Sequence, residues 1–256
     1  IIRKEVHKDA FKNVKILDII NSIRDAGINV AANYIFGLPE ETKESLEFTY
    51  EFAENTNTEM VNFYSAMAYP GSPLHLEARK NNIKVVYAGS SSRHHDPSDS
   101  PYAMTKFLGE EICKLYKKSY NVNVEIARFY NVYGPLEPID EKFGNVIGIW
   151  RAKVLKNLPL PIVGDGNQKR DFTHVYDIVN GLLKISNSKI KHKDAWEIGT
   201  GVNYSINELY LMFKQKYIVE SVNIPDQRGN YRETLRINDD LINLFWLFDF
   251  PDTNLF

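Results

Sequence analysis

The chain has 256 residues and a formal net charge of −2, with 43% hydrophobic and 25% charged residues. This balance is that of an ordinary globular protein and gives no support to a nucleic-acid or membrane partner, and the single cysteine, Cys113, excludes an internal disulfide and a cysteine-held metal cluster. No apolar run approaches the roughly 20 residues that span a bilayer, and the charged opening IIRKEVHKDAFKNVK is no signal peptide, so we expect a cytoplasmic protein.

The first part of the chain alternates helical and strand patterns, which is typical of an α/β layer or barrel. We predict a helix over 9–26 that ends at Gly27, a strand within 28–39, a helix over 40–57 and a strand within 59–74. Acidic residues in the first turn of the second helix suit the helix dipole.

From about residue 84 the pattern is again one of alternating strands and helices. Ser205 is placed to cap a predicted helix over 205–217, and Thr173 is placed to cap one over 173–188. In chain order we predict a strand in 84–92 that runs into a Gly/Ser loop, a helix over 102–120, a strand in 122–134, a helix over 144–157, a strand and loop in 158–172, a helix over 173–188, a strand in 195–201 and a helix over 205–217.

Tyr102 and Lys106 stand four residues apart in the stretch SPYAMTK, at the start of the predicted helix over 102–120. On a helix they share one face, about one turn apart. A lysine ammonium near a phenol stabilises the phenolate, and a phenol tuned in this way exchanges protons with an alcohol. The spacing alone also occurs in many helices without an active site, so its interpretation depends on the neighbouring motifs.

Further motifs occur in a fixed order around this pair. GSSS (89–92) precedes it, and RFYNVYGP (128–135) and GDGNQKRDFTHVYDI (164–178) follow it. Together these motifs resemble the extended short-chain dehydrogenase/reductase family, and specifically its nucleotide-sugar epimerase and dehydratase branch. The resemblance covers about 84–246. It implies an α/β fold with a partial Rossmann-type parallel sheet, a carboxy-terminal substrate-binding region and NAD as the cofactor.

The resemblance also implies roles for individual residues. Tyr102 is the expected catalytic acid/base, and Lys106 is expected to lower its pKa and to hold the nicotinamide ribose. Ser90 matches the catalytic hydroxyl of the family, with Ser91 as the close alternative. Phe129 is expected beside the nicotinamide ring.

The same resemblance implies a set of phosphate contacts. Asn131 resembles the residue that contacts the sugar-nucleotide phosphates, and Arg170 resembles the arginine that pairs with the substrate diphosphate, a role that suits a planar guanidinium. Arg228 and Arg232, in DQRGNYRET, are candidates for a second phosphate-binding arginine. The alternatives are that Asn131 only forms a turn and that Arg170 pairs with Asp171 at the surface.

The stretch SSSRHHD bears on the choice between epimerase and dehydratase. Dehydratases of this kind carry an acid pair just after the strand hydroxyl, and none follows here, which favours epimerisation. In the family mechanism Tyr102 takes the hydroxyl proton while hydride passes to NAD, and hydride then returns to the other face of the ketone.

Only about a dozen residues separate Ser90 from Tyr102, so we expect a trimmed substrate-capping loop. Adjacent histidines, His94 and His95, do not readily share one ion, so no metal site is expected.

The glycine-rich turn that should hold a dinucleotide is absent from the chain. Such a turn follows a strand and presents backbone N–H groups to the pyrophosphate at a helix start. The strands that would precede VVYAG are also absent, and residues 1–83 stand in their place. We therefore expect an open strand edge and weakened anchorage of NAD.

Residues 1–83 resemble a different family. FGLPEET (36–42) and YPGSPL (69–74) are similar to the latter part of a radical S-adenosylmethionine core in the cobalamin-associated group, which implies part of an α/β half-barrel. That family binds an iron–sulfur cluster through CxxxCxxC, and residues 1–83 contain no cysteine, so no cluster is expected.

We therefore interpret the chain as two incomplete domains, residues 1–83 and residues 84–256. The predicted function is NAD-dependent epimerisation of a nucleotide sugar, weak or absent in this chain. The alternatives are a non-catalytic chimeric fragment that binds a nucleotide sugar, and a nucleotide-sugar dehydratase. Relatives commonly form homodimers through the helix that bears Tyr102, so a homodimer is the partner to consider.

Overall fold

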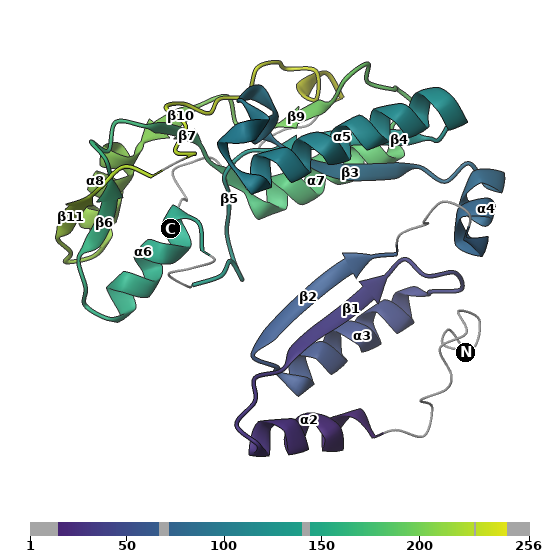
Figure 1. Cartoon of the computed structure of the whole chain (residues 1–256), viewed down its shortest axis with the longest axis horizontal. Coiled ribbons are helices and arrows are strands. Elements are labelled where there is room, and N and C mark those ends of the chain that lie inside the picture. The colour runs from purple at the N-terminus through teal and green to yellow at the C-terminus, as the bar shows by residue number, and fades with distance from the viewer. Residues whose placement is uncertain (1–14, 67–71, 140–143, 228, 245–256) are drawn as a thin grey trace. The chain divides into compact units, whose positions relative to one another are not determined.

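A computed structural model of the chain describes residues 15–66, 72–139, 144–227 and 229–244 (Figure 1). The chain divides into two compact units, Ile1–Lys80 and Asn81–Phe256. The sequence-based boundary after residue 83 falls between the last helix of the first unit and the first strand of the second.

The described part of the first unit follows the predicted alternation of helices and strands and adds one helix, α4 (Pro73–Lys80), that was not predicted; residues 9–14 of the first predicted helix lie outside the described residues. Its two strands are parallel neighbours, in a register that runs from Ala31 opposite Met60 to Phe36 opposite Ser65. Its elements are α2 (Ile16–Asp25), β1 (Ala31–Phe36), α3 (Lys43–Thr56), β2 (Met60–Ser65) and α4 (Pro73–Lys80).

The core of the first unit is thin. Among its described residues, Ile20 and Ala53 are the buried hydrophobic side chains, while Phe48 and Phe63 are 67% and 47% exposed. A two-stranded sheet with so little buried apolar surface is marginal as an independent fold. The resemblance of this part of the chain to a radical S-adenosylmethionine core stays a prediction.

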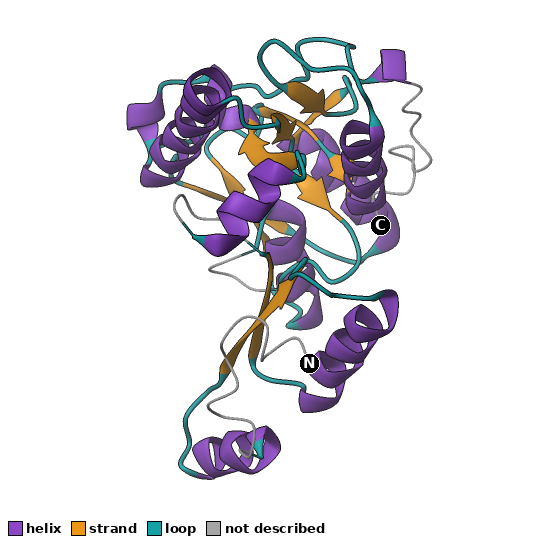
Figure 2. Cartoon of the chain, turned by 90° about the vertical axis from the view of Figure 1, so that its right-hand side faces the viewer, coloured by secondary structure: helices purple, strands orange, loops and turns teal. Residues whose placement is uncertain are grey.

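A three-stranded parallel sheet forms the centre of the second unit. Its order is β3 (Val85–Ser90), β4 (Val124–Phe129) and β9 (Trp196–Ile198), so β3 is an edge strand among the described strands. The crossover from β3 to β4 is α5 (Pro101–Tyr120), and helices lie on both sides of the strands (Figure 2). The sequence-based prediction of a parallel, Rossmann-type sheet is confirmed.

The two faces of this sheet are buried in different ways. One face carries Arg128 and Gly89, which approach Glu110 of α5. The other face packs against α7 (Val175–Asn187), and Ala127, Ile178, Ile185, Trp196, Ile198 and Leu241 form its apolar core. The sheet thus buries a charged layer under α5 and an apolar layer under α7.

A smaller group of short strands packs around a second apolar core. Trp150 lies at its centre, fully buried, with its indole nitrogen donating to Pro161 O at 2.9 Å. The strands pair as β5 (Val132–Tyr133) with β8 (Thr173–His174), β6 (Leu160–Val163) with β11 (Ser221–Ile224), and β7 (Lys169–Asp171) with β10 (Asn203–Ser205). The α-helices of this group are α6 (Val146–Leu155) and α8 (Ile206–Lys216). The short 3-10 helices described in the second unit are η2 (Ser91–His94), η3 (Pro97–Asp99) and η4 (Ile242–Leu244).

One predicted helix cap is confirmed and the other is wrong. Ser205 caps α8 in a capping box, where Ser205 Oγ accepts from Glu208 N and the Glu208 carboxylate accepts from Ser205 N. Thr173 does not cap α7, because it is paired in β8 opposite Val132; His174 is the cap, with its Nδ1 accepting from Tyr176 N at 3.3 Å. The cap of this helix therefore lies one residue later than the pattern indicated.

None of the helices in the described ranges combines the length and apolar character that a membrane crossing requires.

Candidate active site

A pocket of about 380 Å³ opens where β3 and β4 end. The carboxyl ends of parallel strands are the usual place for a ligand in such a sheet. Seven of the residues predicted for the site line it together: Ser90, Ser91, Tyr102, Lys106, Phe129, Asn131 and Arg170.

The serine turn begins at the last residue of β3. Ser90 is the N-cap of η2, and its hydroxyl oxygen accepts from Ser92 N at 3.2 Å. This bond fixes the direction of the Ser90 hydroxyl and does not use its proton, which can be donated to a ligand. Ser91 is buried beside it and lines the same pocket. Ser90 as the catalytic hydroxyl stays a prediction, with Ser91 as the alternative.

Tyr102 and Lys106 lie in the first turns of α5, which Ser100 caps through its bond from Ala103 N. The ammonium of Lys106 donates to Ala88 O at 3.0 Å and lies 5.8 Å from the centre of the Tyr102 ring. The Tyr102 side chain is exposed, so a ligand can reach its phenol. Tyr102 and Lys106 therefore line one pocket together, and their joint role in proton transfer stays a prediction.

A second tyrosine in the pocket wall has a different environment. Tyr130 is almost fully buried, and its hydroxyl donates to Glu197 Oε2 at 2.6 Å. Burial and the charge of Glu197 raise the pKa of Tyr130 well above its ordinary value. Tyr130 therefore stays protonated, and the acid/base role predicted for Tyr102 stays a prediction.

Asn131 connects three segments of the second unit. Its amide nitrogen donates to Asp171 O at 3.0 Å and to Thr234 Oγ1 at 2.9 Å. The donors that a phosphate would need are thus engaged within the protein. The predicted contact between Asn131 and phosphate requires that one of these bonds be exchanged for the ligand.

Arg170 stands between the first pocket and a second one of about 350 Å³. Its guanidinium donates to Asn230 Oδ1 at 2.7 Å and to Lys169 O at 2.8 Å, and burial lowers its pKa from the ordinary value. The neighbouring Asp171 carboxylate points elsewhere and accepts from Thr200 N at 2.8 Å. The alternative of a surface ion pair between Arg170 and Asp171 is therefore wrong.

Of the two other predicted arginines, the structure describes only Arg232. Arg232 forms an ion pair with Asp165 at 2.9 Å, its side chain is 68% exposed, and it lines neither pocket. Arg228 lies outside the described residues. Gly229 and Tyr231, which sequence reasoning missed, line both pockets instead. No local pattern in DQRGNYRET marks these two positions, because its described residues form no regular strand.

The residues of the first pocket fit one end of NAD. Tyr102, Lys106 and Phe129 line a single cavity, with the Lys106 ammonium at its wall, where it can reach ribose hydroxyls. The sequence contains no Gly-x-Gly-x-x-Gly turn, so the backbone cradle that usually holds the pyrophosphate is not supplied by that motif.

The comparisons with known proteins agree with this geometry. Residues 74–199 match the sequence model of the NAD dependent epimerase/dehydratase family. A putative UDP-glucose 4-epimerase of Methanocaldococcus jannaschii is 41% identical over 152 residues, which are 54% of this chain and 48% of that protein. A UDP-glucuronate 4-epimerase of Thermodesulfobacterium geofontis is 31% identical over 173 residues, which are 65% of this chain and 51% of that protein. The chain spans about half the length of these curated relatives.

A solved structure shows the same fold. The UDP-glucuronic acid 4-epimerase of Bacillus cereus, in complex with UDP-glucuronic acid and NAD, aligns with a TM-score of 0.63 at 19% identity, covering 90% of each chain. By both the family match and the curated relatives, residues 74–199 are similar to the NAD dependent epimerase/dehydratase family.

Proposed function

We propose that the second unit contains the proton-transfer residues and the sugar-nucleotide-binding residues of an NAD-dependent nucleotide-sugar epimerase. The observation that carries this proposal is the single pocket in which Ser90, Tyr102 and Lys106 meet Arg170. A nucleotide sugar needs both kinds of group, a proton-transfer site for the sugar and a cation for the diphosphate. The names of the relatives favour a UDP-sugar as the substrate.

Each residue has a distinct part in the proposed reaction. Tyr102 holds or takes the proton of the sugar hydroxyl, and the Lys106 ammonium stabilises the phenolate that results. Ser90 donates a hydrogen bond to the same sugar oxygen, and Arg170 holds the diphosphate between the two pockets. NAD, when bound, supplies the hydride acceptor and donor. Lys106, Tyr102 and Phe129 would hold its nicotinamide end.

We propose that this chain binds NAD weakly, so that its activity is low or absent. The glycine-rich turn is missing from the sequence, and much of the binding free energy of a dinucleotide comes from such a turn. The alternative is a non-catalytic protein that binds a nucleotide sugar without NAD. A dehydratase is the second alternative, and the lack of an acid pair directly after Ser92 argues against it.

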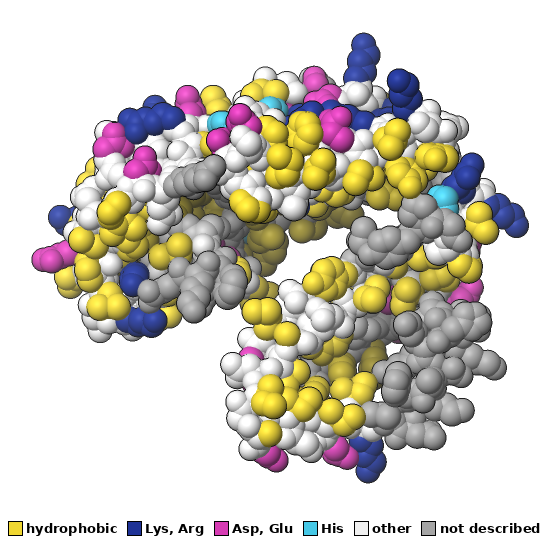
Figure 3. Space-filling view, in the orientation of Figure 1, with side chains coloured by type: hydrophobic (Ala, Val, Ile, Leu, Met, Phe, Trp, Pro, Cys, Tyr) yellow, Lys and Arg dark blue, Asp and Glu magenta, His cyan; other side chains and the backbone are white. Residues whose placement is uncertain are grey.

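A homodimer through α5 is part of the proposal. Hydrophobic side chains follow one another along this helix at spacings of three and four residues and are exposed, namely Met104, Leu108, Ile112 and Leu115. Figure 3 shows hydrophobic side chains on this surface. Light scattering on the protein and on a Leu108→Lys, Ile112→Lys double variant tests the proposal: the variant should be monomeric, and an already monomeric wild type overturns it.

For the first unit we propose a remnant of a radical S-adenosylmethionine core that holds no cluster, because the sole cysteine, Cys113, lies in the second unit. Attempted reconstitution with iron and sulfide, followed by absorbance spectroscopy, should give no iron–sulfur chromophore. A stoichiometric chromophore would contradict this.

Titration calorimetry tests the main proposal. The protein is titrated with UDP-glucose, with UDP-glucuronic acid and with NAD, each alone. Binding of a UDP-sugar with weak or undetectable binding of NAD is the expected result. Micromolar binding of NAD would mean that a complete cofactor site exists, and then an epimerase assay follows. No binding of either UDP-sugar would remove the proposed function.

A further inference from the structure

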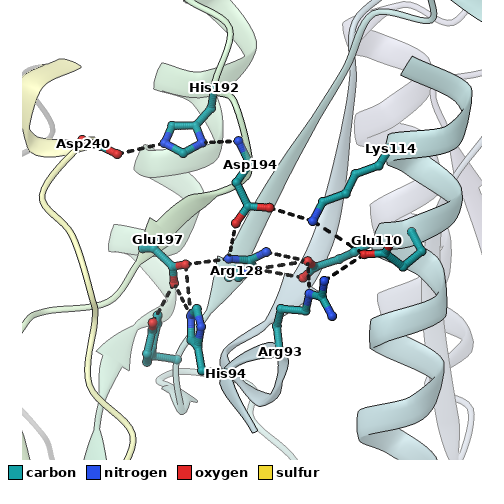
Figure 4. Close-up of polar contacts among 11 residues, drawn as sticks. Arg93, His94, Glu110, Lys114, Arg128, His192, Asp194, Glu197 and Asp240 are labelled. Atoms are coloured by element: carbon teal, nitrogen blue, oxygen red, sulfur yellow. Dashed lines mark hydrogen bonds and ion pairs between the residues drawn. The ribbon is translucent and has the colours of Figure 1, made fainter. Parts of the chain in front are cut away.

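Three successive side chains follow the serine turn, and each contacts a different element of the second unit. Arg93, His94 and His95 come directly after Ser92 in the chain. Figure 4 shows Arg93 and His94 reaching into a buried group of charged residues. The structure gives all three side chains specific partners within the second unit.

Arg93 ties the turn to α5. Its Nη2 donates to Glu111 Oε1 at 2.8 Å, and its Nε lies 3.4 Å from Glu110 Oε2. Its guanidinium also lies 4.2 Å from the centre of the Phe107 ring. All three partners are on the helix that carries the tyrosine–lysine pair. The Arg93 side chain is 21% exposed and Glu110 is fully buried, so the contact with Glu110 is shielded from solvent, while Glu111 is 44% exposed.

His94 ties the turn to β9 and β4. Its Nε2 lies 3.1 Å and 3.2 Å from the two carboxylate oxygens of Glu197. The same carboxylate accepts from Arg128 Nη1 at 3.0 Å and from the Tyr130 hydroxyl at 2.6 Å. Arg128 and Tyr130 come from β4 and the residue directly after it, so one buried carboxylate joins the serine turn to the pocket wall.

His95 ties the turn to the segment that separates the two pockets. Its ring stacks on Tyr231 with 3.8 Å between centres and 6° between planes. Tyr231 lines both pockets. Asn230, the residue before it, accepts from Arg170, so this stack leads directly to the proposed diphosphate contact.

We propose that Arg93, His94 and His95 are positioning residues that set where the Ser90 hydroxyl stands relative to Tyr102 and Arg170. The statement rests on the proposed function, because it assigns these residues to a sugar bound in the first pocket. None of the three is needed to touch the substrate. They act by fixing the turn against α5, β9 and the Tyr231 segment.

The experiment compares His94→Leu, which removes the donor to Glu197, with His94→Gln, whose amide nitrogen can replace it. Arg93→Met is a second, independent removal. Amide hydrogen exchange on each unliganded protein reports how well the serine turn is held. Calorimetry with UDP and with UDP-glucose reports how well the sugar is held, because the ratio of the two dissociation constants isolates the contribution of the sugar.

The expected result is local and specific to the sugar. In His94→Leu and Arg93→Met, the amides of residues 90–96 exchange at least about tenfold faster while those of α8 are unchanged. The affinity for UDP-glucose falls about tenfold and that for UDP stays within about twofold. His94→Gln behaves as the wild type does.

Other outcomes overturn one proposal without the other. If exchange in the serine turn is unchanged in both removal variants, these residues do not position it. If UDP and UDP-glucose lose affinity equally, or α8 exchanges faster as well, their role is only structural. If the wild type binds neither ligand, the proposed function fails, and the hydrogen exchange still decides whether Arg93 and His94 hold the turn.

Discussion

Arg128 and Glu110 form an ion pair inside the fold, with 2.7 Å between Arg128 Nη2 and Glu110 Oε2 and side chains that are 3% and 0% exposed (Figure 4). Burial by itself would lower the pKa of Arg128, but its hydrogen bonds to Glu110 and Asp194 outweigh burial and raise that pKa above its ordinary value. The guanidinium therefore stays charged and joins α5, which carries the tyrosine–lysine pair, to β4.

Replacing Arg128 by Met should destabilise the second unit strongly. The change leaves Glu110 and Glu197 buried without their shared cation, and removal of one partner from such a site costs about 3–5 kcal/mol of the free energy of unfolding. Urea denaturation followed by tryptophan fluorescence measures the loss. Arg232→Met is the matched control, since it breaks an exposed pair with Asp165, and its midpoint should equal that of the wild type. Equal shifts in both variants would contradict this account.

Gly109 of α5 leaves room for the Tyr87 side chain of β3, and an alanine there should be unfavourable. A Cβ at this position would lie 1.9 Å from the Tyr87 hydroxyl oxygen. Alanine favours a helix over glycine by about 1 kcal/mol, yet we expect Gly109→Ala to lower the free energy of unfolding by about 1–3 kcal/mol because of this overlap. Adding Tyr87→Leu should recover much of the loss. A double-mutant cycle with no coupling between the two positions would show that the overlap is relieved in another way.

Much of the site could be predicted because its residues follow strand ends. The serine turn after β3 and Phe129 at the end of β4 meet at one edge of the sheet, as the order of patterns indicated. The helix bearing Tyr102 and Lys106 also begins within one residue of its predicted start. Local patterns of this kind fix an element and the direction in which its side chains leave it.

The remaining features depend on contacts between distant residues. The short strands β10 and β11 were not predicted, because each is defined by pairing with β7 or β6 rather than by its own pattern. Glu110 and Glu197 lie 87 positions apart in the chain and meet at Arg128. Nothing in the sequence marks Arg93 and His94 as partners of buried carboxylates, and only the fold shows the carboxylates that they face.

Tyr102→Phe should separate binding from catalysis. In preparations that convert a UDP-sugar, loss of the phenol proton should lower kcat by about 10²–10⁴-fold, since the acid/base is lost. The dissociation constant for the UDP-sugar should stay within about twofold, because the phenol contributes little to ground-state binding. Tyr116→Phe, on the same helix but outside the pocket, should leave both quantities unchanged. A Tyr102→Phe variant with full kcat would show that another group carries the proton.

Cys113 should react slowly in the native protein. Burial and, after it, the charge of Glu110 raise the pKa of the Cys113 thiol to about 11. The thiolate fraction near neutral pH is then about a hundredfold below that of an ordinary cysteine, and alkylation by iodoacetamide should slow by at least about that factor. Mass spectrometry of native and urea-unfolded samples measures both rates. Similar rates would mean that the α5 surface opens readily in the unliganded protein.

Asp194 should make the stability of the second unit sensitive to acid. Burial by itself would raise its pKa, but hydrogen bonds from Lys114 and Arg128 outweigh burial and lower the pKa of Asp194 to about 2. The pKa in the folded protein lies below that in the unfolded chain, so the unfolded chain takes up the proton first as the pH falls. The resulting stabilisation is fully present above about pH 5 and is lost progressively toward pH 2.

The variant Asp194→Asn isolates this contribution. Urea denaturation of the wild type and the variant is measured at several values between about pH 5 and pH 2.5. At pH 5 the variant should be the less stable of the two, because Lys114 and Arg128 have lost a negative partner at 2.7 Å and 2.8 Å. The difference should shrink as the pH falls, since protonation removes the same charge from the wild type. A difference that stays constant with pH would mean that Asp194 contributes through packing and not through its charge.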